Sequence, residues 1–178
     1  MGRKGKSLDD PNVDKVEVYR AYTTHSPIEM PNRRISRGMV SGDNGTDKKA
    51  ILSAFRKSAE GNPPLRAHGI PVPIILKDES ISHDIKQNQM SKQKLAIITD
   101  YERLDQLLWG GTVIEERIHL TNRFGKLSKK KKNWERLWAV RGSVNIGKKL
   151  HSFDIRVVQI KNEQKAYIYS FDLRRRKK

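Results

Sequence analysis

The sequence contains three runs of lysine and arginine. Their clustered positive charge suits the binding of polyanions, and they are the strongest functional candidates in the chain. Basic side chains that neutralise phosphates release condensed counterions, so they bind nucleic acid with little regard to base sequence. They also attract anionic lipid head groups, at about 1 kcal/mol per Lys or Arg near the surface. The predicted polyanion-binding residues are Arg3, Lys4, Lys6, Arg123, Lys126, Lys129, Lys130, Lys131, Lys132, Arg174, Arg175, Arg176, Lys177 and Lys178.

Most of the positive charge lies in the C-terminal third of the chain. The 178 residues include 37 Lys and Arg against 20 Asp and Glu, which gives a formal charge of +17. Residues 123–178 contribute +14 of this charge, whereas residues 1–60 contribute +4 and residues 61–122 contribute −1. An anionic partner is therefore expected at the C-terminal third. A solvated loop or an import signal is the alternative for each run taken singly.

Side chains that could support catalysis or metal binding lack the required spacing. Cysteine is absent, which excludes disulfides, thiolate zinc sites and cysteine nucleophiles. Glu115 and Glu116 are neighbours, so on a strand they point to opposite faces and cannot act as a pair. No metal-binding pair occurs among the five histidines, which are His25, His68, His83, His119 and His151. We therefore expect a protein that is not an enzyme and has no cofactor or metal.

The aromatic side chains near the basic runs have two interpretations. They could stack on the bases of a single strand, or they could form the hydrophobic face of a sheet. Their alternation favours the sheet, because every second residue of a strand lies on one face. These residues are Trp134, Trp138, Tyr167, Tyr169 and Phe171. No RNA-binding sequence motif accompanies them, so base-specific recognition is not expected.

Alternating apolar residues predict strands in the C-terminal half. Residues 114–120 alternate apolar and charged side chains, as a half-buried strand does. Three further strands have apolar residues on one face; these residues are Trp138, Val140, Val144 and Ile146, then Phe153, Ile155 and Val157, then Tyr167, Tyr169, Phe171 and Leu173. Gly142 interrupts the first of the three. We expect them to form an antiparallel meander.

Helical spacing and turn residues divide the first half of the chain. Thr46 or Asp47 can cap a helix that runs to about Ser58, and Gly61 would end it. A second helix is predicted after a capping box at 99–102, with its end at the glycines 110–111. Prolines predict an extended connection over 61–73, followed by a short edge strand at 74–76. Residues 78–94 suit an exposed loop or weak helix, and residues 95–98 a short buried strand.

Together these elements predict an α+β fold, with an antiparallel sheet concentrated in the C-terminal half and two short helices packed against it. The expected organisation is a flexible basic arm at 1–14, one globular domain over 15–173 that begins with a strand at 16–22, and a basic tail at 174–178. Apolar runs are only a few residues long, far below the ~20 residues of a membrane-spanning helix. Residues 1–6 do not suit a signal peptide.

Several segments resemble the matrix proteins of rhabdoviruses, in particular the short ones of plant-infecting members. The resemblance rests on the basic arm, the predicted strand at 16–22, the glycine-containing turn at 38–42 and the helical segment at 50–55. Two features depart from the family pattern. The segment 62–66 lacks the tyrosine of a Pro-Pro-x-Tyr budding motif, and the charge is heaviest at the C-terminal end rather than in the arm.

The resemblance implies a viral structural protein that bridges the nucleocapsid and an anionic membrane surface and self-associates during virion assembly. Its expected partners are the viral nucleocapsid or RNA, the membrane and further copies of itself. Its expected locations are the virion and the host cytoplasm or inner membrane face, with the host nucleus as an alternative. We expect the arm 1–14 and the connection 61–73 to dock on a neighbouring copy. The other candidate is a basic nucleic-acid-binding protein, such as a small capsid, ribosome-associated or silencing-suppressor protein.

Overall fold

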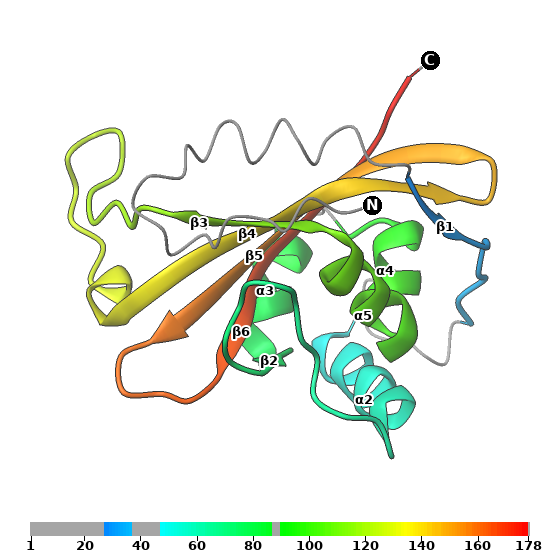
Figure 1. Ribbon diagram of the computed structural model, residues 1–178, viewed down its shortest axis with the longest axis horizontal. Helices are drawn as coiled ribbons and strands as arrows, with labels where there is room; N and C mark the ends of the chain where they lie inside the picture. Colours follow the sequence, from blue (N-terminus) through cyan, green and yellow to red (C-terminus); the bar gives the residue numbers. More distant parts are fainter. Residues whose placement is uncertain (1–26, 37–46, 87–89, 178) are drawn as a thin grey trace.

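Three long antiparallel strands form the centre of the sheet, at the three segments where alternating apolar residues predict strands. They are β4 (Trp134–Ile146), β5 (Lys149–Ile160) and β6 (Ala166–Arg175). Figure 1 shows them in a computed structural model, which describes residues 27–36, 47–86 and 90–177. The arm 1–14, the predicted strand at 16–22, the turn at 38–42 and Lys178 lie outside the described residues. The predicted meander is confirmed.

The sheet is mixed, so the prediction of a purely antiparallel sheet is wrong, although the α+β class is confirmed. Among the described residues it has six strands, in the order β1-β4-β5-β6-β2, with β3 also paired to β4. β1 (Ile28–Met30) runs parallel to β4, and β2 (Ile74–Ile75) runs parallel to β6, whereas β3 (Thr112–Glu116) is antiparallel to β4. The two parallel strands have three and two residues, too few to show alternation.

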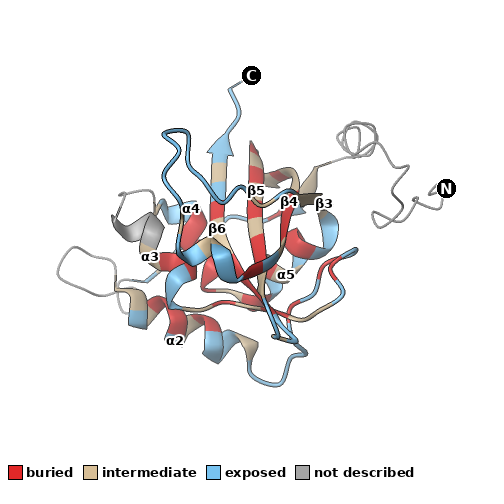
Figure 2. Ribbon diagram, turned by 90° about the vertical axis from the view of Figure 1, so that its left-hand side faces the viewer, coloured by how far each residue is buried: buried red, intermediate tan, exposed pale blue. Residues whose placement is uncertain are grey.

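Four α-helices in the described residues pack near the sheet. They are α2 (Lys48–Ala59), α3 (Asp78–Lys86), α4 (Lys92–Ile98) and α5 (Tyr101–Gly110). The two predicted helices are confirmed as α2 and α5. Asp47 caps α2 by accepting a hydrogen bond from the amide of Lys49 at 2.8 Å. Of the other two, α3 lies in the segment 78–94, for which an exposed loop or a weak helix was expected, and α4 was not predicted. Figure 2 shows the buried residues where the helices meet the sheet.

The segment 95–98 is helical, so its prediction as a strand is wrong. α4 is surrounded by the core, and all of its last five residues are buried. A fully buried short helix and a buried strand both give a continuous apolar run, and periodicity cannot separate them. Thr99 ends this helix, and Asp100 caps α5 by accepting from the amide of Glu102 at 3.1 Å. The predicted capping box is therefore replaced by an aspartate cap one residue later.

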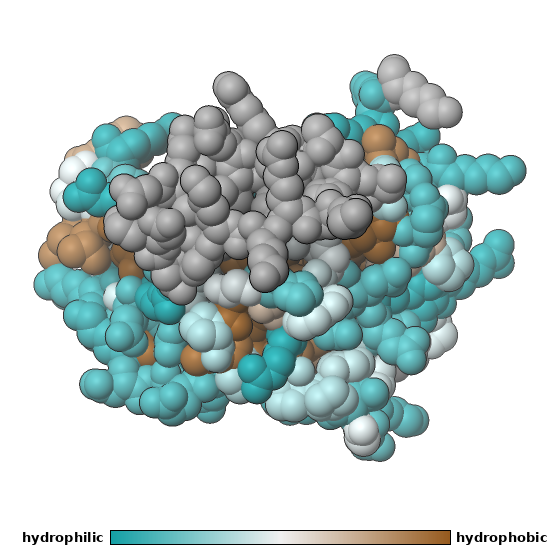
Figure 3. Space-filling model, viewed as in Figure 1, coloured by the Kyte–Doolittle hydropathy of each residue, from teal (hydrophilic) through white to brown (hydrophobic). Residues whose placement is uncertain are grey.

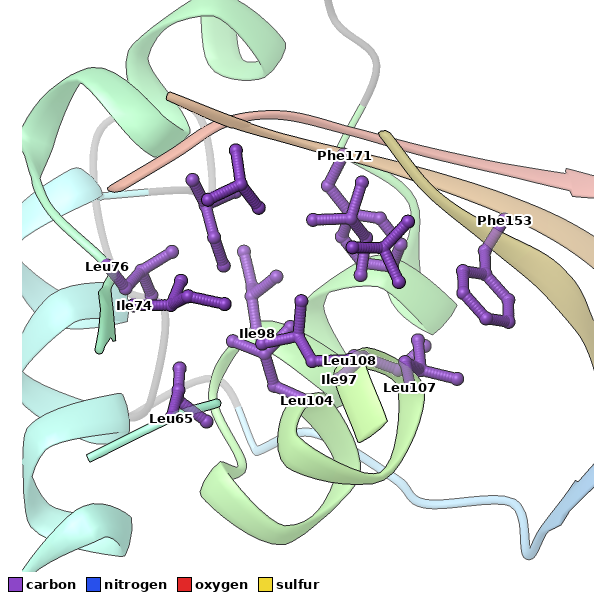
Figure 4. Close-up of a cluster of buried hydrophobic side chains, with 14 of the residues drawn as sticks. Leu65, Ile74, Leu76, Ile97, Ile98, Leu104, Leu107, Leu108, Phe153 and Phe171 are labelled. Carbon is purple, nitrogen blue, oxygen red and sulfur yellow. The ribbon is translucent and has the colours of Figure 1, made fainter. Parts of the chain in front are cut away.

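The main core lies between the helices and one face of the sheet. Trp138, Val140 and Ile155 face it from the strands, and Leu104 and Leu107 face it from α5; each is at most 1% exposed. Figure 4 shows how the leucine and isoleucine side chains of the helices meet the phenylalanines of the strands. The helices and the loop before β2 are therefore held against the same side of the sheet.

A bulge in β6 changes which of its residues share a face. The register with β5 shifts between Arg156 and Val157, which pair with Ser170 and Ile168 and leave Tyr169 as the extra residue. Phe171 therefore packs in the main core, whereas Tyr169 packs in a second cluster on the opposite face. The prediction that 167, 169, 171 and 173 share one face is wrong, because an inserted residue reverses the alternation after it.

The proline-containing connection belongs to the core. Leu65, Ala67 and Ile70 are each 3–4% exposed, and Leu65 forms a bridge with Ile74 of β2. The expectation that residues 61–73 are free to dock on another copy is therefore wrong. Their apolar spacing follows neither the helical nor the strand period, so the sequence pattern did not reveal their burial.

Candidate functional site

The predicted basic residues that the structure describes lie at two opposite ends of the sheet. Residues 123–132 precede β4, whereas residues 174–177 end β6 beside the turn that joins β4 and β5 (Figure 1). β4 connects the two ends with 13 residues. A strand rises about 3.3 Å per residue, so the ends are separated by about 40 Å along β4. The structure thus divides one predicted set into two sites. Arg3, Lys4, Lys6 and Lys178 lie outside the described residues.

The first site is the β3–β4 loop, which we define as residues 117–133. Its tip is held by its own backbone: Thr121 pairs with Leu127, and the amide of Ser128 donates to the carbonyl of Leu120 at 2.7 Å. Within the tip, the side-chain oxygen of Asn122 accepts from two backbone amides, both at 2.9 Å. Gly125 has a φ of +75°, which glycine adopts without strain. The tip is therefore a defined turn.

This turn exposes apolar and basic side chains together. Phe124 is 74% exposed, Leu127 51% and Leu120 44%, while the guanidinium of Arg123 lies 4.8 Å from the Phe124 ring. Lys126 is also exposed. Figure 3 shows an apolar patch at this end of the molecule, surrounded by hydrophilic surface. The predicted strand pattern at 114–120 is confirmed only to Glu116, where β3 ends. Residues 117–120 belong to the β3–β4 loop instead.

The lysine run lies beside a small aromatic cluster. The 3₁₀ helix η2 (Lys130–Asn133) leads into β4. It places Lys131 Nζ 5.6 Å from the ring centre of Trp134, and Lys130 Nζ 5.6 Å from that of Tyr169. The two rings meet edge to face at 4.9 Å. Such cation–π contacts stabilise a cation near a ring without removing it from water.

The rings themselves are packed rather than open to a ligand. Trp134 is 6% exposed and Tyr167 2%, and burial raises the pKa of the Tyr167 hydroxyl. Lys77 Nζ lies 3.8 Å from the centre of the Tyr167 ring. Trp138 and Phe171 are buried in the main core. Of the two interpretations of the aromatic residues, the structure therefore supports sheet packing for these four rings.

Several arginines of the sheet have carboxylate partners. Glu116 binds Arg141 at 2.8 Å and Arg156 at 2.9 Å, and Asp154 binds Arg141 at 3.0 Å, across β3, β4 and β5. Glu115 binds Arg136 at 2.9 Å instead, so the two adjacent glutamates do face opposite ways. A charge count along the sequence could not show these pairs, which form between residues up to 40 positions apart. They reduce the charge available to a partner in the middle of the sheet.

The second site is a groove beside the β4–β5 turn. It has a volume of about 1160 Å³. Its lining residues are Pro27, Asn145, Gly147, Lys148, Lys149, Leu150, Arg175, Arg176 and Lys177. Arg174 and Arg175 belong to β6, and the amide of Arg176 donates to the carbonyl of Leu150 at 2.8 Å. The predicted tail therefore begins as strand.

Sequence reasoning missed Lys148 and Lys149 as members of this site. They stand in a turn far from the C-terminal run along the chain, and only strand pairing brings the two segments together. A glycine followed by two lysines between two predicted strands was the signal that could have found them. Arg123, Lys126 and the lysine run do not approach this groove, because they precede the other end of β4.

Three further observations bear on function. No three His, Asp or Glu side chains in the described part of the chain are grouped so that they could hold a metal ion. None of the helices in that part is long and apolar enough to cross a bilayer. Comparisons with protein-family models, with curated proteins and with solved structures found no match. Function is therefore inferred from the geometry and charge of the chain itself.

Proposed function

We propose that this chain is a non-enzymatic structural protein of the viral matrix type, which bridges a nucleocapsid and an anionic membrane surface and self-associates during virion assembly. The observation that carries the proposal is the β3–β4 loop, whose defined tip exposes Phe124 and Leu127 beside Arg123 and Lys126. Exposed apolar side chains ringed by cations are typical of segments that lie in a membrane interface. The resemblance to rhabdovirus matrix proteins points to the same class.

The energy of this contact suits a protein that acts in many copies. Full burial of one large apolar side chain contributes about 1.5–3 kcal/mol, and Phe124, Leu127 and Leu120 are already partly covered. Each nearby cation adds about 1 kcal/mol at an anionic surface. One loop therefore gives weak, reversible binding. Copies joined in a layer would bind far more tightly, because each further contact is made at high effective concentration.

The two-ended arrangement suits a bridge. The β3–β4 loop and the β4–β5 groove are separated by about 40 Å along β4, so partners at the two ends would not exclude each other. The middle of the sheet, where Arg141 and Arg156 pair with carboxylates, offers less charge to either partner. The alternative of a basic nucleic-acid-binding protein draws support from the groove alone, and it leaves the exposed apolar tip without a role.

Liposome co-sedimentation tests the membrane contact. Vesicles of phosphatidylcholine with 30% phosphatidylserine should bind the protein, and the double variant Phe124→Ser, Leu127→Ser should bind several-fold less. The variant keeps the charge and leaves the backbone hydrogen bonds of the tip in place. The matched control is Trp109→Ser, which removes an aromatic side chain that is 51% exposed on α5, where it stacks on His68.

Two outcomes decide this test. Loss of binding in the tip variant but not in the control supports the proposal. Equal binding by wild type and tip variant would refute the membrane contact and favour the nucleic-acid-binding alternative. Replacement of the four lysines 129–132 by Ala should weaken binding mainly at low salt, because screening removes this component first.

A further inference from the structure

Among the residues that the structure describes, those that line the groove beside the β4–β5 turn include five basic side chains and no acidic one. Lys148 and Lys149 come from the turn and the start of β5, and Arg175, Arg176 and Lys177 come from the end of the chain. The other lining residues that the structure describes are uncharged, and one of them, Asn145, donates a hydrogen bond to the carboxylate of Glu29 at 2.8 Å. This composition differs from the middle of the sheet, where carboxylates accompany Arg136, Arg141 and Arg156. The groove is therefore a concentrated positive site that calls for an anionic partner.

The walls of the groove are fixed by backbone pairing on both sides. His151 of β5 pairs with Arg175, and the amide of Arg176 extends this pairing to Leu150. On the other side the amide of Gly147 donates to the carbonyl of Met30 at 2.8 Å, which ties the turn to β1. Gly147 has a φ of +62°, and a side chain there would meet Asn32 at 2.7 Å. The backbone that carries the basic side chains is thus held in place by hydrogen bonds on both sides of the groove.

The lining also limits the kind of anion. None of the described residues that line the groove is aromatic, so they provide no platform on which bases could stack. None of the exposed large apolar residues of the described chain, which are Trp109, Leu120, Phe124 and Leu127, belongs to it, so it lacks the insertion element of the β3–β4 loop. A concave surface fits a flexible chain better than the plane of a membrane. The shape and composition favour a linear polyanion held by its charges.

We propose that this groove binds the sugar–phosphate backbone of single-stranded nucleic acid without reading its bases. Two of the five cations are arginines, whose planar guanidinium groups can bind phosphate oxygens in pairs. The repeating phosphates of a single strand can occupy successive cations along the groove. This inference deepens the nucleocapsid side of the proposed function and rests on it for the identity of the partner as RNA.

Fluorescence anisotropy with labelled 20-nucleotide oligo(U) and oligo(A) tests the inference. The double variant Lys148→Glu, Lys149→Glu should lose at least tenfold in affinity at 0.1 M salt. Its salt slope should fall by about 1.4, because each phosphate contact to a single strand contributes about 0.7. The two oligonucleotides should bind the wild type equally. Both lysines are exposed, so the fold should be kept, and circular dichroism checks this.

The matched control is Lys161→Glu, Lys165→Glu in the β5–β6 turn at the other end of the sheet, where both side chains are also exposed. It changes the net charge equally and should retain most of the affinity. An equal loss in both variants would show that overall charge, not the groove, binds the strand, and would overturn the inference. A strong preference for one oligonucleotide would overturn recognition by backbone alone.

Two further measurements distinguish single-stranded nucleic acid from an acidic peptide and from a membrane as the partner of the groove. If polyglutamate binds the groove as tightly as the oligonucleotides and displaces them, the site is one for acidic peptide and the inference fails. If the groove variant loses liposome binding but retains oligonucleotide binding, the groove is a membrane contact and the inference fails. The tip variant tests the proposed membrane function separately, so each proposal can fail while the other stands.

Discussion

Gly142 shows how one residue without a side chain shapes the core. It pairs with Phe153 on the neighbouring strand, and an added Cβ would lie 2.7 Å from the edge of the Phe153 ring. A Cβ on Gly111 would also meet this ring, at 3.1 Å. The sequence marked Gly142 as an interruption of the strand pattern but gave no reason for it. The reason is the space that the ring of Phe153 occupies.

Substitution of Gly142 by Ala should therefore destabilise the protein by about 1–3 kcal/mol, the usual cost of overpacking a core. Phe153→Leu should relieve the collision, so the double variant should be more stable than the sum of the two single effects predicts. Urea unfolding of the four proteins measures this coupling. Additive effects would show that the ring of Phe153 is not what the added methyl group meets.

Asp105 on α5 should lower stability at neutral pH. Burial raises the pKa of its carboxyl group, so the folded state holds the proton more tightly than the unfolded state. The ionised group therefore costs stability above its folded pKa, and this cost disappears as the pH falls below the unfolded value of about 3.9. Asp105→Asn should raise Tm at pH 7 by at most about 2–4 °C, the shift that 1 kcal/mol produces in a chain of this size.

Two readouts check this prediction. Differential scanning calorimetry should show the gain in Tm at pH 7 and its loss near pH 3.5. The pKa of Tyr101, which burial and then the charge of Asp105 raise, should move towards its ordinary value in the variant. A variant that is less stable than the wild type at pH 7 would show that the carboxylate has a favourable partner in solution.

Among the secondary-structure elements, α5 and its capping residue connect the segment after β1 to the other helices. Asp100 accepts from the amide of Glu102 and also forms ion pairs with Arg33 at 3.5 Å and Arg103 at 3.6 Å. Arg103 in turn donates to the carbonyl of Pro31 at 2.7 Å, immediately after β1. One aspartate therefore begins a helix and holds the segment that follows the edge strand.

Asp100→Ala should cost about 1–2 kcal/mol of unfolding free energy, because it removes both the cap and the ion pairs. Asp100→Asn keeps a capping oxygen and should cost less than about 1 kcal/mol, since partly exposed ion pairs contribute little. Chemical denaturation compares the two. If the Asn variant is as unstable as the Ala variant, the ion pairs rather than the cap hold this junction.

Element prediction succeeded where a period was long enough to be recognised. Alternating apolar residues at 138–146, 153–157 and 167–173 identified β4, β5 and β6, and helical spacing after a capping residue at 46 or 47 identified α2. It failed for α4, where burial on all sides removes the polar face that distinguishes a helix. It also failed after Tyr169, because a bulge depends on how two strands pair and cannot be recognised from the sequence of one strand alone.

At the scale of the whole molecule, the sequence predicted that the basic runs belong to the site but not how they are divided. One run precedes β4 and the other begins in the last two residues of β6, and the antiparallel order of β4, β5 and β6 places them at opposite ends of the sheet. Lys148 and Lys149 join the second run only through this order. Position along a sheet depends on topology, which a charge count does not contain.

The net charge of +17 also sets opposite salt dependences for the proposed activities. Binding to phosphates weakens as salt rises, because the release of counterions is less favourable when the surrounding salt concentration is high. Association of two copies should strengthen, because their repulsion acts over about 30 Å at 0.01 M salt but only about 8 Å at 0.15 M. Static light scattering should therefore show assemblies that grow with salt over this range, while co-sedimentation with anionic vesicles declines.

A charge-reduced variant provides the control for this prediction. Replacement of Lys129, Lys130, Lys131 and Lys132 by Ala lowers the net charge to +13, so assembly should begin at lower salt than in the wild type. These lysines lie at the loop end of the sheet, and the β4–β5 groove keeps its charge. Assemblies that dissolve as salt rises would mean that ion pairs join the copies. A protein that stays monomeric throughout, with anionic vesicles present, would be incompatible with a matrix layer and would leave nucleic-acid binding as the function of the groove.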